Sequence, residues 1–447
     1  MAINPIFRRK IYERLLKWKK DSNGASALLV QGARRIGKST IVEEFARREY
    51  KTYILVDFTK CSQEVKDLFN DVSDLNYIFL RLQLIYNVQL IERQSLIIFD
   101  EVQFQPKARQ AIKSFVEDHR YDYVETGSLI SIRKNTKNIL IPGEEERINM
   151  YPMDYEEFRW ALGDTATVPL LRTVWEHPQP LNEAHRKMMR DFRLYMLVGG
   201  MPQAVDTYLK TNNFEAVDRT KRLILDLYDE DFGKIDPSGK AARIFAAIPA
   251  QLNGNASRYQ ISSVISGANA EDYVELISEM EKSMTVNISH HCDDPNVGLV
   301  ANEDLCQYKM FTGDTGLFVT LAFRDKAFTE NVIYERLLSD KLPANLGYLY
   351  ENIVAQMLTA SGNKLFYHTW PTESGKHNYE IDFLLSYGTK ITPVEVKSST
   401  YKTHVSMDKF CEKYSSRITN ERYLVYTKDH AKEGTVRYLP AYLAYFL

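Results

Sequence analysis

The sequence predicts an α/β fold organised around a parallel sheet, followed by further domains. Three observations support this prediction. An apolar run leads into a glycine-rich turn at residues 28–40, several short apolar segments end in polar residues, and segments with helical periodicity lie between them. Alternating strands and helices favour a parallel sheet, because each crossover helix returns the chain to the same end of the sheet. Ligands then bind at the carboxyl ends of the strands, where the candidate residues below are expected to lie.

Length and composition limit the number of domains and the kinds of partner that the protein can have. The 447 residues are enough for two to four domains, and the net charge of −2 does not indicate nucleic acid or an anionic membrane as a partner, so any basic surface must be local. The four cysteines form no C-x-x-C pair, which favours a reducing compartment and argues against zinc. No apolar run approaches the roughly eighteen residues of a membrane span, and the N-terminus lacks a signal-peptide core. We expect a cytoplasmic protein without a membrane partner.

The first motif is a glycine-framed loop that fits the phosphate-binding pattern G-x-x-x-x-G-K-[ST], also called Walker A. Its expected nucleotide-binding residues are Gly32, Ala33, Arg34, Arg35, Ile36, Gly37, Lys38, Ser39 and Thr40. Glycines let the backbone turn its N–H groups toward phosphate oxygens, and the next helix presents its positive dipole end to the same anion. We expect Lys38 to reach the β- and γ-phosphates and Ser39 to ligate Mg²⁺. The alternative is a simple glycine turn between a strand and a helix.

The second motif ends the apolar strand expected at residues 95–101, where Asp100 and Glu101 stand together. This is the Walker-B pattern. We expect Asp100 to hold Mg²⁺ through water and Glu101 to polarise the water that attacks the γ-phosphate. Two acids at the end of a strand are common in α/β proteins, so the combination with the upstream loop is what indicates an ATPase that uses ATP and Mg²⁺. Another buried strand is expected at residues 53–58.

A fourth strand, expected at residues 121–128, ends in the hydroxyls of Thr126 and Ser128. In an ATPase of this layout, that position carries the polar group that senses the γ-phosphate. Either hydroxyl could fill the role, and we favour Ser128. The alternative, of equal weight, is a hydroxyl that caps the next turn.

Residues 143–148 (Gly-Glu-Glu-Glu-Arg-Ile) and 151–158 (Tyr-Pro-Met-Asp-Tyr-Glu-Glu-Phe) resemble the prokaryotic AAA+ ATPases that carry a C-terminal domain of unknown function. That family places an arginine shortly before a P-[ML]-[SD]-[FY]-x-E-F signature, and Arg147 occupies the place. The resemblance implies that Arg147 contacts a γ-phosphate, in cis or from a neighbouring subunit. The structural alternative is pairing with the acids around it. The resemblance extends from about Phe7 to Lys397.

The resemblance also implies how the rest of the chain is organised. We expect an AAA+ ATPase core over residues 1–160, a helical lid or linker over 161–235, a winged-helix-like domain over 236–325 and a PD-(D/E)XK nuclease-like α/β domain over 326–447. Prolines make residues 162–181 loop-like, and helical periodicity returns over 182–231. The Gly-Gly-Met-Pro element at 199–202 resembles one in the family's lid, and for these four residues themselves we favour a helix–helix turn. Residues 311–317 match a further family signature.

Within residues 240–320, apolar stripes at helical spacing precede an alternating strand at 284–288. This order resembles the winged helix that the family has here, a module that reads the DNA major groove or serves as a protein contact. The expected reading helix, residues 270–283, carries five acids and one lysine, which argues against contact with phosphates. Residues 290–294 (His-His-Cys-Asp-Asp) suggest a metal site, but neighbours on a strand point to opposite faces, so we expect a loop.

The last hundred residues contain a second candidate site. A strand is expected at residues 379–385, and residues 392–397 return as its partner after a turn. Period-two geometry puts Glu380 and Asp382 on one face, and Glu395 and Lys397 likewise share a face. If the strands pair, three acids and a lysine converge. That arrangement suits phosphodiester cleavage, in which carboxylates hold one or two Mg²⁺ ions and a lysine orients or deprotonates the nucleophile.

The spacing D-(x)12-E-x-K, preceded by a glutamate in a helix, resembles the PD-(D/E)XK nuclease superfamily, although Ile381 stands where the superfamily's name has proline. The resemblance implies that Asp382 and Glu395 are metal ligands, that Glu351 is the helical acid of the metal site and that Lys397 is the catalytic lysine. It also makes DNA or RNA a candidate partner. The alternative is solvated charge on an exposed hairpin.

We therefore expect an ATP-hydrolysing AAA+ protein that couples hydrolysis to a nuclease-like domain acting on or binding nucleic acid. The alternative, from another class, is a nucleotide-dependent switch whose C-terminal half is a non-catalytic platform for a protein partner. A P-loop kinase of a small molecule is disfavoured, because no arginine-bearing lid follows the loop and the carboxylate pair suits water activation. A homo-oligomer fits the AAA+ resemblance, since a neighbour's arginine often completes such a site.

Overall fold

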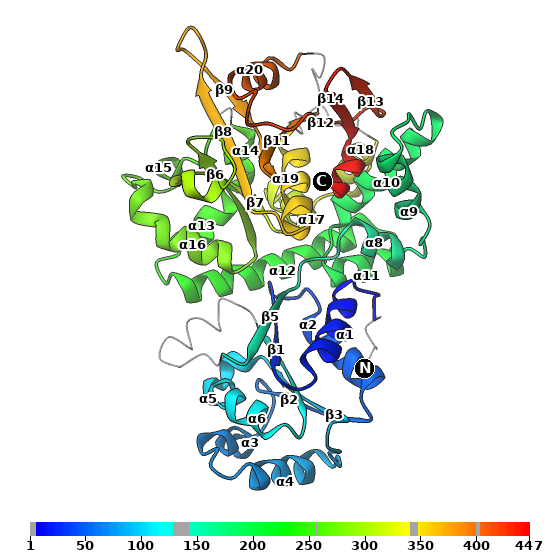
Figure 1. Ribbon diagram of the computed structural model, residues 1–447, viewed down its shortest axis with the longest axis vertical. Coiled ribbons are helices and arrows are strands. Elements are labelled where there is room, and N and C mark those ends of the chain that lie inside the picture. The colour runs from blue at the N-terminus through cyan, green and yellow to red at the C-terminus, as the bar shows by residue number, and fades with distance from the viewer. Residues whose placement is uncertain (1–5, 128–142, 255–256, 340–346, 399–402) are drawn as a thin grey trace. The chain divides into compact units, whose positions relative to one another are not determined.

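The computed structural model describes residues 6–127, 143–254, 257–339, 347–398 and 403–447 (Figure 1). The chain divides into two compact units, residues 1–151 and residues 152–447, except that the short segment 282–284 groups with the first unit. The described helices include none with the length and apolar character of a membrane span.

The first unit is built on a five-stranded sheet in which every neighbouring pair of strands is parallel, in the order β2-β3-β4-β1-β5. Its strands are β1 (Ala27–Gln31), β2 (Thr52–Asp57), β3 (Ser95–Asp100), β4 (Asp122–Gly127) and β5 (Glu145–Asn149). The predicted parallel sheet is confirmed, with the expected strands in place. Because β4 lies between β1 and β3, the loop that follows β1 and the acids that follow β3 meet across the end of β4.

Helices cover both faces of this sheet (Figure 1). They are α1 (Ile11–Ser22), α2 (Lys38–Glu49), α3 (Gln63–Asp67), α4 (Leu75–Tyr86), α5 (Pro106–Gln110) and α6 (Ile112–Asp118), with 3-10 turns η1 (Leu68–Asn70) and η2 (Val102–Phe104). The face toward α4 and α6 holds an aromatic core in which Phe69, Phe99 and Phe115 contact one another. Burial on both faces explains why β1 and β3 read as continuous apolar runs.

The second unit begins with α8 (Tyr155–Ala161), α9 (Thr167–Glu176), α10 (Glu183–Val198), α11 (Pro202–Thr211) and α12 (Phe214–Ile235). The last three confirm the helical periodicity predicted over 182–231. The expectation of a loop over 162–181 is wrong, because α9 lies there. Its proline, Pro169, falls in the first helical turn, where a missing N–H breaks no helical hydrogen bond. Val168, Leu171 and Val174 form the buried side of α9.

A mixed sheet of order β7-β6-β8-β9 follows, in which β6 pairs antiparallel with β7 and parallel with β8. Before it and within it lie α13 (Lys240–Ala246), α14 (Ile248–Asn253), α15 (Ile261–Val264), η3 (Ala270–Tyr273), α16 (Val274–Lys282), β6 (Val286–Cys292), η4 (Leu299–Asn302), β7 (Glu303–Thr312), α17 (Thr315–Ala322) and α18 (Asn331–Leu338). The sheet thus joins strands from both sides of residue 326, where the nuclease-like domain was expected to begin. Residues 290–292 belong to β6, so the loop expected over 290–294 is wrong for these three.

The remaining elements are α19 (Gly347–Ala360), β8 (Leu365–Pro371), β9 (Asn378–Ile381), β10 (Phe383–Tyr387), β11 (Lys390–Lys397), α20 (Val405–Lys413), β12 (Arg422–Tyr426), β13 (Ala431–Glu433), β14 (Val436–Pro440) and η5 (Ala441–Phe446). The predicted hairpin is present: β10 and β11 are antiparallel, with Phe383 opposite Val394, in a sheet of order β10-β11-β12-β14-β13. The strand expected at 379–385 is interrupted at Asp382, which lies between β9 and β10.

The family-signature segments of the second unit have a structural explanation. Asp154 and Glu157 of the Pro152–Phe158 segment form a capping box at the start of α8, since each side chain accepts the other residue's backbone N–H. Asp314 of residues 311–317 caps α17 by accepting the Leu317 N–H at 2.9 Å, and it also accepts the Gly200 N–H at 2.6 Å. The Met153 N–H in turn donates to the Gly200 carbonyl at 2.7 Å. Three distant signatures therefore meet at Gly200.

Replacing Gly200 by alanine is expected to destabilise the second unit by about 1–3 kcal/mol, the usual cost of forcing an atom into a packed interior. A Cβ on Gly200 would overlap the Met153 carbonyl oxygen and lie 2.7 Å from the Met153 nitrogen, and neither backbone atom can move away as a flexible side chain could. Differential scanning calorimetry checks this. The matched control is Gly233→Ala in α12, where an added Cβ meets no described atom within 4 Å and helix propensity predicts equal or higher stability. Equal Tm values for the two variants would contradict the packing argument.

Candidate functional site

The glycine-framed loop joins β1 to α2 and is held in a tight turn. Gly37 has a φ of 92°, in the left-handed region that favours glycine, and α2 begins at the next residue. A Cβ on Gly32 would overlap the Met150 carbonyl oxygen and the Ile36 side chain, so only glycine fits there. Arg35, between them, also has a positive φ of 69°. The two glycines of the predicted pattern are therefore required by backbone geometry and packing.

Lys38 points into the loop that precedes it. Its side chain is buried, and Nζ donates to the carbonyl oxygens of Gly32 at 3.1 Å and Ala33 at 2.8 Å. The ammonium therefore lies on the concave side of the loop at the N-terminus of α2, where the loop N–H groups and the helix dipole both favour an anion.

Ser39 and Asp100 come together although 61 residues separate them. The Ser39 hydroxyl donates to Asp100 Oδ1 at 2.6 Å, and the hydroxyl of Thr126 on β4 donates to the same oxygen. Asp100 and Thr126 are both buried. Hydroxyl and carboxylate oxygens are the ligands that Mg²⁺ prefers, so this oxygen pair fits the ion that a P-loop ATPase uses.

Glu101 follows Asp100 in an unusual backbone conformation. Its φ of 55° and ψ of 48° are left-handed, a region that residues other than glycine, asparagine and aspartate seldom adopt. Gln103 Nε2 donates to Glu101 Oε2, and the Glu101 N–H donates to the Thr126 hydroxyl at 3.4 Å. Gln103 is buried, so it holds the Glu101 carboxylate in one orientation. No motif position marks Gln103, so its role is not evident from the sequence.

The sensor residue favoured from the sequence, Ser128, lies outside the described residues. Thr126, the alternative weighed with it, is the hydroxyl that contacts Asp100. Arg147 lies on β5 opposite Leu29, and its Nε donates to Glu145 Oε1 at 2.7 Å. Arg147 therefore has the acidic partner that the structural alternative expected, while its side chain stays 44% exposed and accessible to another molecule.

The C-terminal hairpin brings together the acids and the lysine of the second predicted site. The Val396 N–H donates to Asp382 Oδ2 at 2.8 Å, which fixes Asp382 beside the strand that carries Glu395 and Lys397. Lys397 Nζ lies 3.0 Å from Glu395 Oε1 and donates to the Thr403 carbonyl at 2.8 Å. Glu395 Oε2 is buried and has no hydrogen-bond partner among the described residues. Burial raises the pKa of Glu395 to about 7, against the opposing charge of Lys397.

Lys309 is a member of this cluster that sequence reasoning missed. It lies on β7, and its Nζ is 3.5 Å from Glu351 Oε2 and 3.4 Å from Asp382 Oδ1, and also contacts Glu380. Burial alone would lower the pKa of Lys309, but the three carboxylates hold it well above its ordinary value. Burial raises the pKa of Glu351 to about 7, although Lys309 opposes the shift. The cluster is therefore a network of carboxylates with an internal cation.

These carboxylates do not fit a divalent metal in the observed arrangement. Asp382 uses one oxygen for the Val396 N–H and the other for Lys309, and Glu395 uses one oxygen for Lys397. Magnesium binds through one or two carboxylates and completes its shell with water, whereas Glu395 Oε2 is the one carboxylate oxygen of Asp382 and Glu395 left without a hydrogen-bond partner among the described residues. Across the described ranges 6–127, 143–254, 257–339, 347–398 and 403–447, no three His, Cys, Asp or Glu side chains are placed to hold a metal ion.

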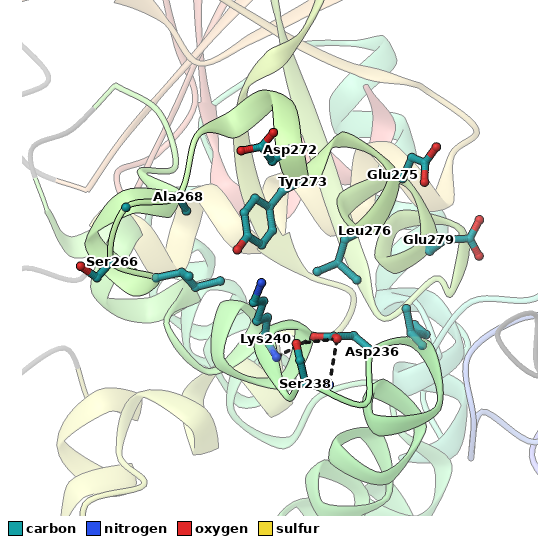
Figure 2. A pocket seen from close by; sticks show the side chains of 13 residues that line it. Asp236, Ser238, Lys240, Ser266, Ala268, Asp272, Tyr273, Glu275, Leu276 and Glu279 are labelled. Atoms are coloured by element: carbon teal, nitrogen blue, oxygen red, sulfur yellow. Dashed lines mark hydrogen bonds between the residues drawn. The ribbon is translucent and has the colours of Figure 1, made fainter.

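A cavity of 660 Å³ elsewhere in the second unit lies between the α12–α13 connection and the segment from α15 to α16 (Figure 2). Tyr273 and Leu276 face Lys240, whose Nζ is 5.2 Å from the Tyr273 ring centroid. The acidic residues of the lining are Asp236, Asp272, Glu275 and Glu279. Asp236 accepts the N–H groups of Ser238, Lys240 and Ala241 and so belongs to the turn before α13. The acidic lining disfavours a phosphate-bearing ligand here.

Three segments of the chain match known family models. Residues 25–159 match the family model of an AAA domain, residues 189–327 match a domain of unknown function (DUF8612), and residues 346–443 match another domain of unknown function (DUF4143). No curated protein sequence matches the chain. The predicted resemblance to an AAA+ ATPase followed by a domain of unknown function is confirmed at this level.

Three solved structures similar to the chain share little sequence with it. The Walker-type ATPase of Pyrococcus abyssi has 16% identity and a TM-score of 0.43, over 71% of this chain and 96% of that chain. The RuvB Holliday junction branch migration motor of Thermotoga maritima has 10% identity and a TM-score of 0.29, over 63% of this chain and 89% of that chain. Drosophila ORC bound to DNA has 11% identity and a TM-score of 0.29, over 85% of this chain and 92% of that chain.

The parallel sheet, the loop with Lys38, the Ser39–Asp100 contact and the AAA-domain match together define the class of the first unit. It is a P-loop ATPase domain of the AAA type.

Proposed function

We propose that this protein binds ATP with Mg²⁺ at the loop between β1 and α2 and hydrolyses it to ADP and phosphate. The observation that carries the proposal is the contact of Ser39, Asp100 and Thr126, because it places the hydroxyl of the loop and the acid of β3 at one point beside Lys38. A simple glycine turn needs none of these contacts.

Each residue of the site has a distinct role in this proposal. The loop N–H groups and Lys38 bind the β- and γ-phosphates, and Ser39 with Asp100 would hold Mg²⁺, which neutralises developing charge on the phosphate oxygens when bound. Glu101, oriented by Gln103, accepts a proton from the attacking water. Thr126 reports the state of the γ-phosphate to Asp100 through its hydroxyl. Arg147, released from Glu145, would supply positive charge in cis or to a neighbouring subunit of a homo-oligomer.

For the C-terminal half, the geometry favours the nucleotide-dependent switch over the metal-dependent nuclease. Lys309 and Lys397 neutralise the carboxylates that a nuclease would use for its metal. We propose that ATP binding and hydrolysis change how this half binds a protein partner, with the carboxylate–lysine network serving to hold the domain together.

The second candidate function is cleavage of DNA or RNA by the C-terminal domain. It is favoured by one specific observation: Asp382, Glu395 and Lys397, predicted from the D-(x)12-E-x-K spacing, do lie together. The buried Glu395 Oε2 that lacks a partner among described residues is consistent with it.

One set of assays separates these functions. The full chain is incubated with ATP and Mg²⁺, and the products are identified, with and without DNA and RNA and with Mg²⁺ or Mn²⁺. We expect ADP and free phosphate, and no cleavage of either nucleic acid beyond that of an Asp382→Asn variant. A phosphorylated small molecule in place of free phosphate would identify a kinase. Cleavage that the Asp382→Asn variant loses would establish the nuclease and reject the non-catalytic platform.

A further inference from the structure

The carboxylate cluster of the second unit is organised around an ammonium group. Glu351 lies on α19, Glu380 on β9 and Asp382 in the link between β9 and β10, while Lys309 comes from β7. Lys309 Nζ is within 3.5 Å of a carboxylate oxygen from each acid. A lysine ammonium has three N–H donors, so the three carboxylates match its full donor capacity. Four separate segments therefore converge on one cation.

We propose that Lys309 is the resident cation of this cluster. While its ammonium is in place, these side chains are not positioned to hold a metal ion, and the cluster of Glu351, Glu380 and Asp382 accepts a divalent ion only when Lys309 is removed and the carboxylates close onto the vacated position.

Electrostatics explains why the cluster favours an internal cation. Three carboxylates brought within contact distance of one point repel one another, and partial burial strengthens that repulsion because water screens it less. A buried acid without a partner is strongly unfavourable, whereas an acid that is paired and hydrogen-bonded is tolerated. Lys309, itself 6% exposed, supplies the charge internally. A divalent ion and the ammonium would repel each other at this separation, so one excludes the other.

A cavity gives access to part of the carboxylate cluster. Lys309, Glu351 and Glu380 line a cavity of 260 Å³, far more than the roughly 15 Å³ that a single water requires in the same measure. Water and ions in this cavity can therefore reach Glu351 and Glu380. What keeps a divalent ion out is the ammonium already among them, and this inference does not depend on whether the first unit hydrolyses ATP.

The test is a titration of the nucleotide-free full chain with Mn²⁺. Binding is measured from the electron paramagnetic resonance signal of the Mn²⁺ that stays free. The variants are Lys309→Ala, the double variant Lys309→Ala with Asp382→Asn, and the control Lys210→Ala, which removes an exposed lysine paired with the single acid Asp206. Any Mn²⁺ bound at Ser39 and Asp100 is common to all samples. We expect Lys309→Ala to bind one Mn²⁺ more than the wild type, and the double variant and the control to match the wild type.

Thermal stability provides a second measurement. Mn²⁺ is expected to raise the Tm of Lys309→Ala more than it changes the Tm of the wild type, because an ion that binds only the folded state stabilises it. The change in Tm caused by Mn²⁺ should be the same for Lys210→Ala as for the wild type. Wild-type binding of Mn²⁺ that Asp382→Asn abolishes would overturn the proposal, and so would a folded Lys309→Ala without the additional site. If Lys309→Ala does not fold, the wild-type titration decides alone: binding unchanged by Asp382→Asn supports the proposal, and binding lost in that variant overturns it.

Discussion

Replacing Glu101 by glutamine is expected to reduce kcat for ATP hydrolysis by about 10²–10⁴-fold, the range found when a positioned general base is removed. Glutamine keeps the size of the side chain but cannot accept the proton of the attacking water. The left-handed backbone at Glu101 and the hydrogen bond from Gln103 show that the protein fixes this carboxylate. Because Lys38, Ser39 and Asp100 are unchanged, affinity for ATP should stay within a few-fold of the wild type. Steady-state phosphate release and equilibrium ATP binding measure the two quantities separately.

The matched control for this prediction is Glu117→Gln on α6, an exposed glutamate 3.8 Å from Lys113. It makes the same chemical change in the same domain and is expected to leave kcat unaltered. If Glu101→Gln hydrolyses ATP at the wild-type rate, another residue activates water, and Glu101 is strained for a structural reason.

The second large effect is expected from Lys38→Ala, which should weaken ATP binding by about 10²-fold or more. Each charge-assisted hydrogen bond from an ammonium to a phosphate is worth about 1.5–3 kcal/mol, and 1.4 kcal/mol corresponds to a factor of ten. The buried ammonium also donates to the Gly32 and Ala33 carbonyls, so its removal loosens the loop. A fluorescent ATP analogue measures the affinity. The control, Lys113→Ala, removes a lysine that is 58% exposed and should bind ATP normally. Equal affinities for Lys38→Ala and Lys113→Ala would remove Lys38 from the site.

The first site was largely accessible from the sequence because its residues lie at positions that local patterns mark. An apolar strand, a glycine-framed turn and a helix determine where Lys38 and Ser39 lie, and a second apolar strand ends at Asp100. Parallel pairing then brings the ends of these strands together, since all carboxyl ends lie at one edge of the sheet. Gln103 was not found, because its role depends on the 3-10 turn η2 and the left-handed Glu101 before it, which no residue pattern specifies.

The second site shows where sequence reasoning stops. Asp382 directly precedes β10, and Glu395 lies on its hairpin partner β11, so their approach is local enough to predict from the sequence. Lys309 on β7 reaches Asp382 because β7 pairs with β6 and β6 pairs in parallel with β8, a contact between strands more than seventy residues apart. Such pairings leave no trace in the residues around either strand. The loop expected over 162–181 failed for a different reason: a proline in the first turn of a helix looks the same, in sequence, as a proline in a loop.

The family signatures of the second unit also acquire a physical meaning. Asp154 and Asp314 cap helices, and Gly200 permits a backbone approach that a side chain would block. Their meeting point stabilises the helical region after the ATPase domain, which supports a structural role for these residues rather than a chemical one.

Isothermal titration calorimetry of the unaltered chain with ATP and with GTP, in the presence of Mg²⁺ and with Lys38→Ala in parallel, tests the central claim most directly. The account predicts a saturable heat for ATP with the unaltered chain that Lys38→Ala lacks. Identical, negligible heats for both proteins with both nucleotides would contradict it, because the loop would then not be a nucleotide-binding site.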